Sequence, residues 1–393
     1  MKRFKPAVAL LATAITVGAW APAAVAGGAG ASTPGVTDTE IKIAVIGGFT
    51  GLTGAITERG YEGLQTWADE VNDAGGINGR KVSLQKFDHK ETADGGVAAC
   101  KDALEIDPFV VSVPEGVEAN LTATDCLDKA GVPTLYFAGT NDPKWKQAFS
   151  YIPTAAAQGK SLASFTKEVL HGAKKKIGVM YESGQAPESG AKAFLKAAKK
   201  LKLDIVDKEV VEPSQSSFVP QLQRLQNAGA EIVWLAAVNT SLGIFRDAKQ
   251  IGFEPQFTGG GFTFDFLSSL LKDQVKGVKG LRFGATVDSD AYKKYDAVMK
   301  KYGRSKSREK DNEAFLFYGH GLLLGEMLTQ AGPNPTRESF VAGAEKIKNF
   351  KTGILPPITY GPGDHVGADA SYPTVCCNSD FTWKGAGAPK AKF

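Results

Sequence analysis

The chain has 393 residues, enough for two domains of ordinary size, and 43% of them are hydrophobic, enough to form buried cores. Its formal net charge of +4 reflects 46 basic and 42 acidic residues. Removal of residues 1–26 would take away Lys2, Arg3 and Lys5 and no acid, which lowers the net charge to +1. Such a balance gives no electrostatic argument for nucleic acid or a membrane surface as a partner.

The first 26 residues have the features of a secretory signal. "MKRFK" is cationic, the apolar stretch that follows is too short for a good membrane span, and "AVA" precedes Gly27. We therefore expect residues 1–26 to be a cleaved signal peptide that directs export to the periplasm, followed by a flexible leader at 27–40. No cysteine lies near this cleavage site, so lipid attachment there is excluded.

From residue 41, short β-rich runs alternate with amphipathic stretches. This order predicts a parallel, doubly wound α/β sheet. The predicted strands are 41–47, 81–87, 109–113 and 133–137, and the predicted helices lie around 64–71, 93–104 and 118–129.

The same order of elements then restarts and predicts a second parallel sheet. Its strands are 176–182, 203–211, 231–238 and 256–260, and its helices lie around 190–201, 218–227 and 242–250. A strand at 280–287 and helices around 291–302 and 313–330 follow. The helix 190–201 is rich in lysine, and its basic face is most simply a solvated one.

The glycine-rich turn "GGFTGLTGA" follows the first strand. Its glycines miss the spacing of the dinucleotide fingerprint, and it lacks the Gly-Lys-Ser/Thr ending of a phosphate loop. A turn beyond the carboxyl end of a parallel strand can still bring its backbone close to a ligand. Thr50 and Thr53 offer hydroxyls there, although either could equally cap the next helix.

Catalytic motifs are missing from the sequence. The nearest match to a nucleophile elbow, around Ser189, lacks its first glycine, and no H-E-x-x-H motif occurs. We therefore expect no enzyme activity, no metal and no cofactor.

Several stretches together resemble the solute-binding proteins of ABC importers of the leucine/isoleucine/valine-binding type. They include "IKIAVIGGFTGLTG", "NDAGGINGRKV" and "AGVPTL". The resemblance implies the α/β type I periplasmic-binding-protein fold, with two Rossmann-like lobes, parallel central sheets and three crossovers, near 138–155, 285–310 and 350–356. Lobe 1 would hold residues 41–140 plus about 310–350, and lobe 2 residues 150–285 plus about 355–393.

The resemblance also implies which residues contact the solute. They would lie in the loops that follow the parallel strands of both lobes. The positions are Phe49, Thr50, Thr53, Glu115, Gly116, Ala138, Gly139, Thr140, Ala186, Asn239, Gly261 and Phe262.

Four of these positions depart from the family pattern. Glu115 and Gly116 stand where a serine usually meets the ligand carboxylate, and Ala186 replaces a stacking tyrosine. Gly261 replaces the acid that pairs with an α-amino group. Because a buried ammonium without a carboxylate is very costly, an amino-acid ligand would have to recruit Glu115 or Asp265. Phe262, Phe264 and Tyr136–Phe137 instead favour a ligand with apolar or aromatic area. Phe137, at the end of a strand, is more simply a core residue.

The four cysteines allow three pairings, and export favours disulfides. Cys100 and Cys126 lie on helices that such a winding places side by side, so we expect them to be linked. Cys376 and Cys377 would form a vicinal disulfide or stay reduced. A zinc site has neither CxxC spacing nor nearby histidines in its favour.

The sequence therefore predicts a periplasmic receptor that captures a small organic solute, amino acid-like or a carboxylate, by closure of two lobes. Its partners would be the solute and the membrane permease subunits of an ABC importer, with the protein itself a monomer. One alternative is a sensory or regulatory receptor of the same fold. A second alternative is an exported α/β enzyme.

Overall fold

The computed structural model describes residues 33–51, 54–114, 118–137, 144–237, 240–264, 275–304, 312–376 and 383–390. The predicted signal peptide lies outside these residues. Part of the predicted leader lies within them, where the Lys42 N–H donates to the Gly35 carbonyl at 2.8 Å. Gly35 has a φ of +70° and lies directly against the backbone of Phe109, where no side chain would fit.

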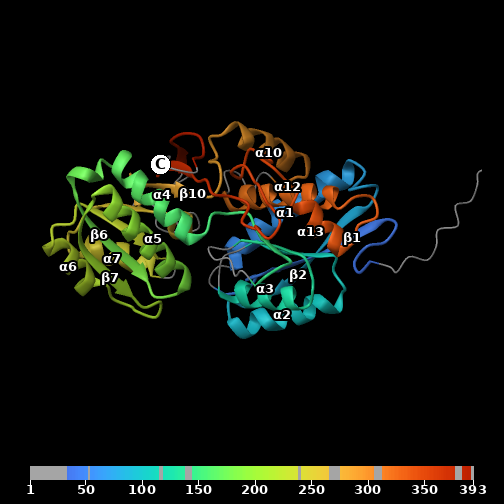
Figure 1. Cartoon of the computed structure of the whole chain (residues 1–393), viewed down its shortest axis with the longest axis horizontal. Coiled ribbons are helices and arrows are strands. Elements are labelled where there is room, and N and C mark those ends of the chain that lie inside the picture. Colours follow the sequence, from blue (N-terminus) through green and yellow to red (C-terminus); the bar gives the residue numbers. More distant parts are fainter. Residues whose placement is uncertain are drawn as a thin grey trace, which may run out of the picture. The chain divides into compact units, whose positions relative to one another are not determined.

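The first sheet is parallel and has the order β2-β1-β3-β4-β5. Its strands are β1 (Glu40–Gly47), β2 (Lys81–Asp88), β3 (Val110–Val113), β4 (Thr134–Tyr136) and β5 (Ala148–Ser150). The helices α2 (Ala93–Glu105) and α3 (Glu118–Lys129) cover one face, and α1 (Gly54–Asp73) and α12 (Asn312–Gln330) cover the other (Figure 1). The four strands and three helices predicted for this half are present.

The second sheet is parallel with the order β7-β6-β8-β9. Its strands are β6 (Lys176–Glu182), β7 (Asp204–Val211), β8 (Ile232–Ala236) and β9 (Gln256–Gly259). One face packs against α4 (Ala155–Glu168) and α5 (Gln185–Leu201), the other against α6 (Val219–Asn227) and α7 (Ser241–Gln250). The predicted parallel α/β class is therefore confirmed for both halves.

A third sheet is antiparallel, in the order β10-β11-β12. It contains β10 (Lys279–Arg282), β11 (Tyr372–Cys376) and β12 (Trp383–Gly385). β10 lies beside β9, so close that a Cβ on Gly280 would come within 2.6 Å of the Gly259 carbonyl oxygen. The predicted strand 280–287 is shorter than expected and ends at Arg282.

Glycines allow the closest helix contacts. A Cβ on Gly63 of α1 would lie 1.9 Å from the Ala314 carbonyl oxygen of α12. A Cβ on Gly159 of α4 would lie 2.2 Å from the Gly190 carbonyl oxygen of α5. Larger residues would force both helix pairs apart.

Two predicted chain crossings lie elsewhere. Phe283 and α10 (Asp290–Lys301) already pack in the first core, so the chain leaves the second lobe at β10 and not at 285–310. Residues from Ile354 to Ala368 also pack in the first core, and Val366 bridges to Ser150 beside β5. The return to the second lobe therefore follows residue 368 and not 350–356, because this segment covers the edge of the first sheet.

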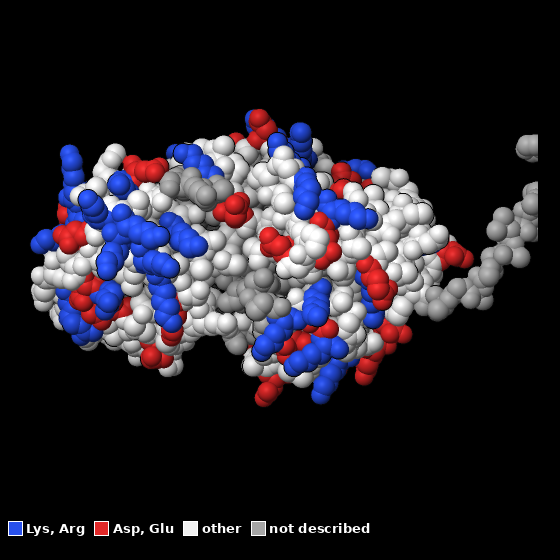
Figure 2. All heavy atoms as spheres, viewed as in Figure 1, with Lys and Arg blue, Asp and Glu red and all other residues white. Residues whose placement is uncertain are grey.

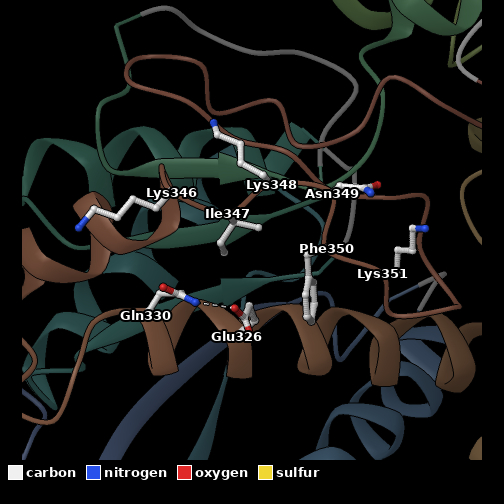
Figure 3. Close-up of a pocket in the computed structure, with 8 residues that line it drawn as sticks. All are labelled: Glu326, Gln330, Lys346, Ile347, Lys348, Asn349, Phe350 and Lys351. Carbon is white, nitrogen blue, oxygen red and sulfur yellow. Dashed lines mark hydrogen bonds between the residues drawn. The ribbon is translucent and has the colours of Figure 1, made fainter.

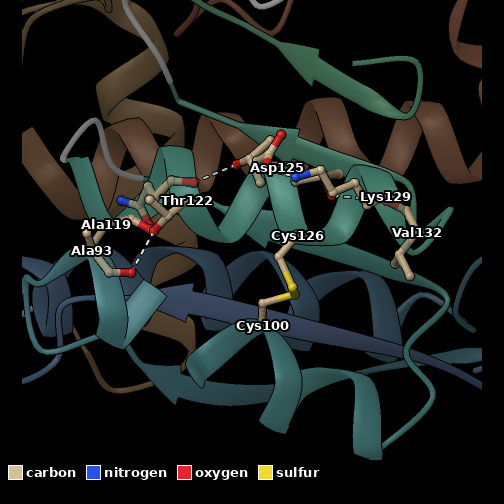
Figure 4. The surroundings of a disulfide bond; sticks show 11 residues. Ala93, Cys100, Ala119, Thr122, Asp125, Cys126, Lys129 and Val132 are labelled. Carbon is tan, nitrogen blue, oxygen red and sulfur yellow. Dashed lines mark hydrogen bonds and ion pairs between the residues drawn. A yellow bond between two sulfur atoms is a disulfide. The ribbon is translucent and has the colours of Figure 1, made fainter. Parts of the chain in front are cut away.

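Cys100 and Cys126 form a disulfide between α2 and α3, with 6.3 Å between their Cα atoms, which confirms the predicted link (Figure 4). Cys376 is disulfide-bonded too, so it is not reduced, and Cys377 lies outside the described residues.

Candidate functional site

The predicted contact residues follow the parallel strands in the sequence. Phe49, Thr50, Ala186 and Gly261 are described in full, and Phe262 in its backbone. The others lie outside the described residues: Thr53, Glu115, Gly116, Ala138, Gly139, Thr140 and Asn239. Their contacts with a solute stay predictions.

The carboxylate of Asp88 organises the glycine-rich turn. Asp88 ends β2, next to the end of β1, and its Oδ1 accepts from the backbone N–H of Phe49 at 3.0 Å and of Thr50 at 3.4 Å. Its Oδ2 accepts from the Thr50 hydroxyl at 2.5 Å. Burial alone would raise the pKa of Asp88, but these donations and one from the Lys90 N–H outweigh it and hold the pKa below its ordinary value.

Two consequences follow for a ligand at this turn. Because the Thr50 hydroxyl proton and two backbone N–H groups point to Asp88, none of these donors is left for a ligand anion. A second acid, Glu91, flanks the turn, so that a Cβ on Gly51 would lie 3.0 Å from the Glu91 carboxyl group. The turn therefore presents the oxygen lone pairs of Thr50 between two carboxyl groups.

The ring of Phe49 supports the turn from the side of its own lobe. It meets Tyr61 of α1 edge to face, with 5.8 Å between ring centroids. The Lys86 ammonium lies 5.1 Å from the Phe49 centroid and 4.9 Å from that of Tyr61. These contacts hold Phe49 as part of the wall of the first lobe.

A buried polar network lies under the loop that follows β3. Ser112 Oγ of β3 lies 2.8 Å from His320 Nε2 of α12, and the Tyr151 hydroxyl donates to the Pro114 carbonyl at 3.4 Å. The rings of Tyr151 and His320 meet edge to face at 4.8 Å. Complete burial lowers the pKa of His320 to about 3, so this histidine is neutral in the folded protein.

The loop that follows β4 is fastened at its far end. The backbone N–H groups of Lys146 and Gln147 donate to Asp128 at 2.7 and 2.6 Å. Trp145 donates to Asp125 at 3.3 Å and packs edge to face against Tyr136. Both acids belong to α3, so this helix fixes where the chain re-enters β5.

Two aromatic residues weighed as pocket candidates are core residues. Tyr136 and Phe137 are both 1% exposed. Phe137 packs against Tyr151 and Phe283, with centroid distances of 5.5 and 5.1 Å. The interpretation of Phe137 as a core residue is confirmed.

In the second lobe, Ala186 lies in the first turn of α5, where it is half-buried, and Gly261 begins the short helix α8 (Gly261–Phe264). Thr263 ties α8 to the end of β8, because its hydroxyl donates to the Leu235 carbonyl at 3.1 Å and accepts from the Ala237 N–H at 3.4 Å. This tether fixes the backbone of Gly261 at the edge of the second sheet.

Sequence reasoning missed two polar residues that lie beside predicted contact positions, Asp88 and Gln158. Gln158 of α4 is 4% exposed and donates to the Pro153 carbonyl, and a Cβ on Gly260 would lie 2.3 Å from its side-chain oxygen. Asp88 had a readable signal, since an acid directly after a parallel strand lies at the ligand-binding edge. Gln158 had none, because α4 itself was not predicted.

A separate open depression of about 570 Å³ lies on the first lobe (Figure 3). Glu326 and Gln330 of α12 line it together with the segment 346–351. Lys348 donates to the Tyr360 carbonyl, and Gln330 donates to Glu326 at 2.8 Å. None of the predicted contact residues lines it.

The part of the chain that the structure describes contains no cluster of three or more His, Cys, Asp or Glu residues that could hold a metal ion. Within the same residues, no helix is both long and apolar enough to cross a membrane.

Comparison with known proteins decides the family. Residues 40–378 match the family described as "Periplasmic binding protein". The chain belongs to this family. It is 28% identical to the Leu/Ile/Val-binding protein homolog 3 of Brucella melitensis, over 56% of this chain and 61% of that relative. The similarity thus spans about three fifths of that relative's length.

Solved structures of similar fold extend over most of this periplasmic binding protein. The fatty acid ABC transporter substrate-binding protein of Thermomonospora curvata superposes with a TM-score of 0.78 and 18% identity, over 92% of this chain and 94% of that one. A solute-binding protein of an ABC transporter from Rhodopseudomonas palustris, in complex with 3,4-dihydroxybenzoic acid, superposes with a TM-score of 0.73 and 18% identity. This similarity covers 90% of this chain and 98% of that one. The predicted two-lobe type I fold is confirmed.

Proposed function

We propose that this periplasmic binding protein is the substrate-binding receptor of an ABC importer, is exported to the periplasm as a monomer, and carries out no catalysis. It captures a small carboxylate with an apolar or aromatic body between its two lobes. Closure buries the solute, and the closed form docks on the permease. The membership in the binding-protein family supports the role, and the two fold relatives that bind a fatty acid and an aromatic acid support the solute class.

The single observation that carries the solute class is the second-lobe edge at Gly261, which has no side chain to meet an ammonium. An ammonium buried there without a carboxylate would be strongly disfavoured. A carboxylate with an apolar body avoids that cost, and the donors for its oxygens would come from the segment 138–140.

A second candidate, an amino acid, is favoured by Glu91. Its carboxylate flanks the glycine-rich turn and could offset an ammonium on the first-lobe side. The name of the Brucella relative, a Leu/Ile/Val-binding protein homolog, points in the same direction.

Matched ligand pairs that differ only in the amino group separate the two candidates. We would titrate 4-methylpentanoate against leucine, and 3-phenylpropanoate against phenylalanine, by isothermal calorimetry. The proposal expects the acids without an amino group to bind at least tenfold more tightly. Tighter binding of leucine, weakened at least tenfold in Glu91→Gln, would establish the second candidate instead.

Transport is tested separately from binding. Deletion of the gene should abolish high-affinity uptake of the solute that calorimetry identifies. Normal uptake together with a lost transcriptional response to that solute would assign the protein as a sensory receptor. Conversion of the solute by the purified protein would show an enzyme.

A further inference from the structure

Lysines occupy the outer face of the α4–α5 layer. Lys160 and Lys167 of α4 are exposed seven residues apart, and the exposed residues of α5 follow a helical period along one side. We call the following set the lysine face: Lys160, Lys167, Lys192, Lys196, Lys199 and Lys200. Figure 2 shows basic side chains gathered over these two helices.

The two helices form one continuous surface. Leu162 of α4 and Phe194 of α5 share one core cluster with Ile177 of β6, so both helices cover the same face of the second sheet. The close approach of Gly159 to Gly190 leaves no gap between them. The outward residues of α4 and α5 therefore share one solvent-exposed surface. Glu168 is the one exposed acid on the described part of this surface.

The charges of the lysine face are not paired locally. No residue of the lysine face takes part in an ion pair with any described residue. Several lysines elsewhere each bind a carboxylate within 2.9 Å: Lys86, Lys129, Lys293, Lys300 and Lys301. The near-neutral total charge thus conceals one surface whose positive charge is not locally compensated.

The opposite layer of the same sheet shows that an exposed face rich in lysine is not a general property of the second lobe. On α6 and α7, Arg224 pairs with Glu209 and Arg246 with Asp247, both at 2.6–2.7 Å. The remaining exposed positions there are mostly amides, such as Gln223, Gln226 and Gln250.

We propose that the lysine face binds the anionic surface of a lipid bilayer and keeps the receptor near the membrane. Each lysine close to an anionic membrane strengthens attachment about fivefold at moderate salt, so six give appreciable but reversible attachment. The expectation that this basic face is merely solvated is replaced by this proposal.

The chemistry favours lipid over a protein partner. The face contains lysine and no arginine, and lysine is depleted at protein interfaces, where the planar arginine fork is preferred. Large hydrophobic residues are not exposed on these two helices, so no apolar anchor for a protein partner is present on the described surface. Diffuse point charges on a flat layer suit a fluid array of phosphate headgroups.

Sedimentation with sucrose-loaded vesicles tests the proposal. The purified protein is mixed with phosphatidylcholine vesicles that contain or lack phosphatidylglycerol, at low and at physiological salt. We expect binding only to the vesicles with phosphatidylglycerol and weakening by salt. The variant K192Q/K196Q/K199Q should lower the partition coefficient about 10- to 100-fold.

The matched control is K293Q/K300Q/K301Q, which removes the same charge from α10 and should change partitioning less than about threefold, since those lysines are already paired. Equal losses in both triple variants, or equal binding to both vesicle types, would overturn the proposal. Binding only to vesicles that carry the permease would identify a protein partner and overturn it as well. Thermal unfolding and solute titration of each variant verify that the fold and the proposed receptor function are intact.

Discussion

At the residue scale, Asp88 shows how one carboxylate shapes a loop. Asp88→Asn keeps an oxygen for the backbone N–H groups but replaces the oxygen that accepts the Thr50 hydroxyl with an amide donor. We expect a loss of about 1–2 kcal/mol in unfolding free energy and a several-fold weaker solute affinity, because a charge-assisted hydrogen bond is lost at the turn. Urea unfolding and calorimetry measure the two effects.

The same substitution has a defined pH dependence. The pKa of Asp88 is lowered on folding from its ordinary 3.8, so its contribution to stability is fully present above pH 3.8 and is lost as pH falls through the folded value. Asp88→Asn should therefore remove part of the acid sensitivity below that pH. Asp73→Asn, at an exposed acid far along α1, is the control for affinity. An unchanged affinity in Asp88→Asn would separate the turn from the solute site.

At the element scale, the contact between β3 and α12 is testable through His320. Its pKa falls from 6.5 to about 3 on folding. Between these two pH values, His320 is therefore protonated in the unfolded chain and neutral in the folded protein. The stability associated with neutral His320 is complete above pH 6.5 and decreases as pH falls toward 3. His320→Gln should flatten this part of the pH profile of unfolding free energy, measured by urea titration between pH 7.5 and 4.5, a range that includes the ordinary pKa of histidine.

His171→Asn is the matched control, since His171 is exposed and has a left-handed φ of 54° that asparagine tolerates. Its pH profile should follow that of the unmodified protein. A profile of His320→Gln parallel to both would show that the buried histidine is not the origin of the slope. Ser112→Ala would additionally cost about 1–3 kcal/mol, because it leaves the buried His320 Nε2 without this partner.

The elements also show what a sequence can and cannot predict. Long apolar runs such as Ile41–Gly47 and Lys176–Glu182 predicted strands within a residue of their ends, since a strand buried on both faces leaves a strong local signal. β5 has three residues and α13 (Arg337–Ala344) eight, too short for a periodic pattern, and both were missed. Asp88 was missed for a different reason. Its role arises from the register of β1 against β2. The sequence of one strand alone does not determine how it pairs with another strand.

At the scale of the whole molecule, the four strands of the second parallel sheet repeat the order of the first four strands of the first sheet, and the chain crosses between the two cores three times. Repetition of the element order predicted the two lobes, but the family resemblance placed the last crossing too early. The reason lies in residues 354–368. They pack against β5 through Phe149, whose ring stacks on His365 at 3.9 Å and meets Tyr360 at 5.1 Å. Such long-range packing leaves no periodic signal in the segment itself.

Solute capture by closure makes a prediction at this scale. A ligand held by loops from both sheets stabilises the closed arrangement only through contacts that the open one lacks, so binding and compaction are coupled. Saturating solute should lower the radius of gyration measured by small-angle X-ray scattering. It should also raise the unfolding free energy by about 2.7 kcal/mol at a hundredfold excess over Kd. K192Q/K196Q/K199Q should compact as the unmodified protein does, because the lysine face lies on the outer layer of the second sheet. Full stabilisation without any compaction would mean that the solute binds within one lobe, and the clamp mechanism would then be wrong.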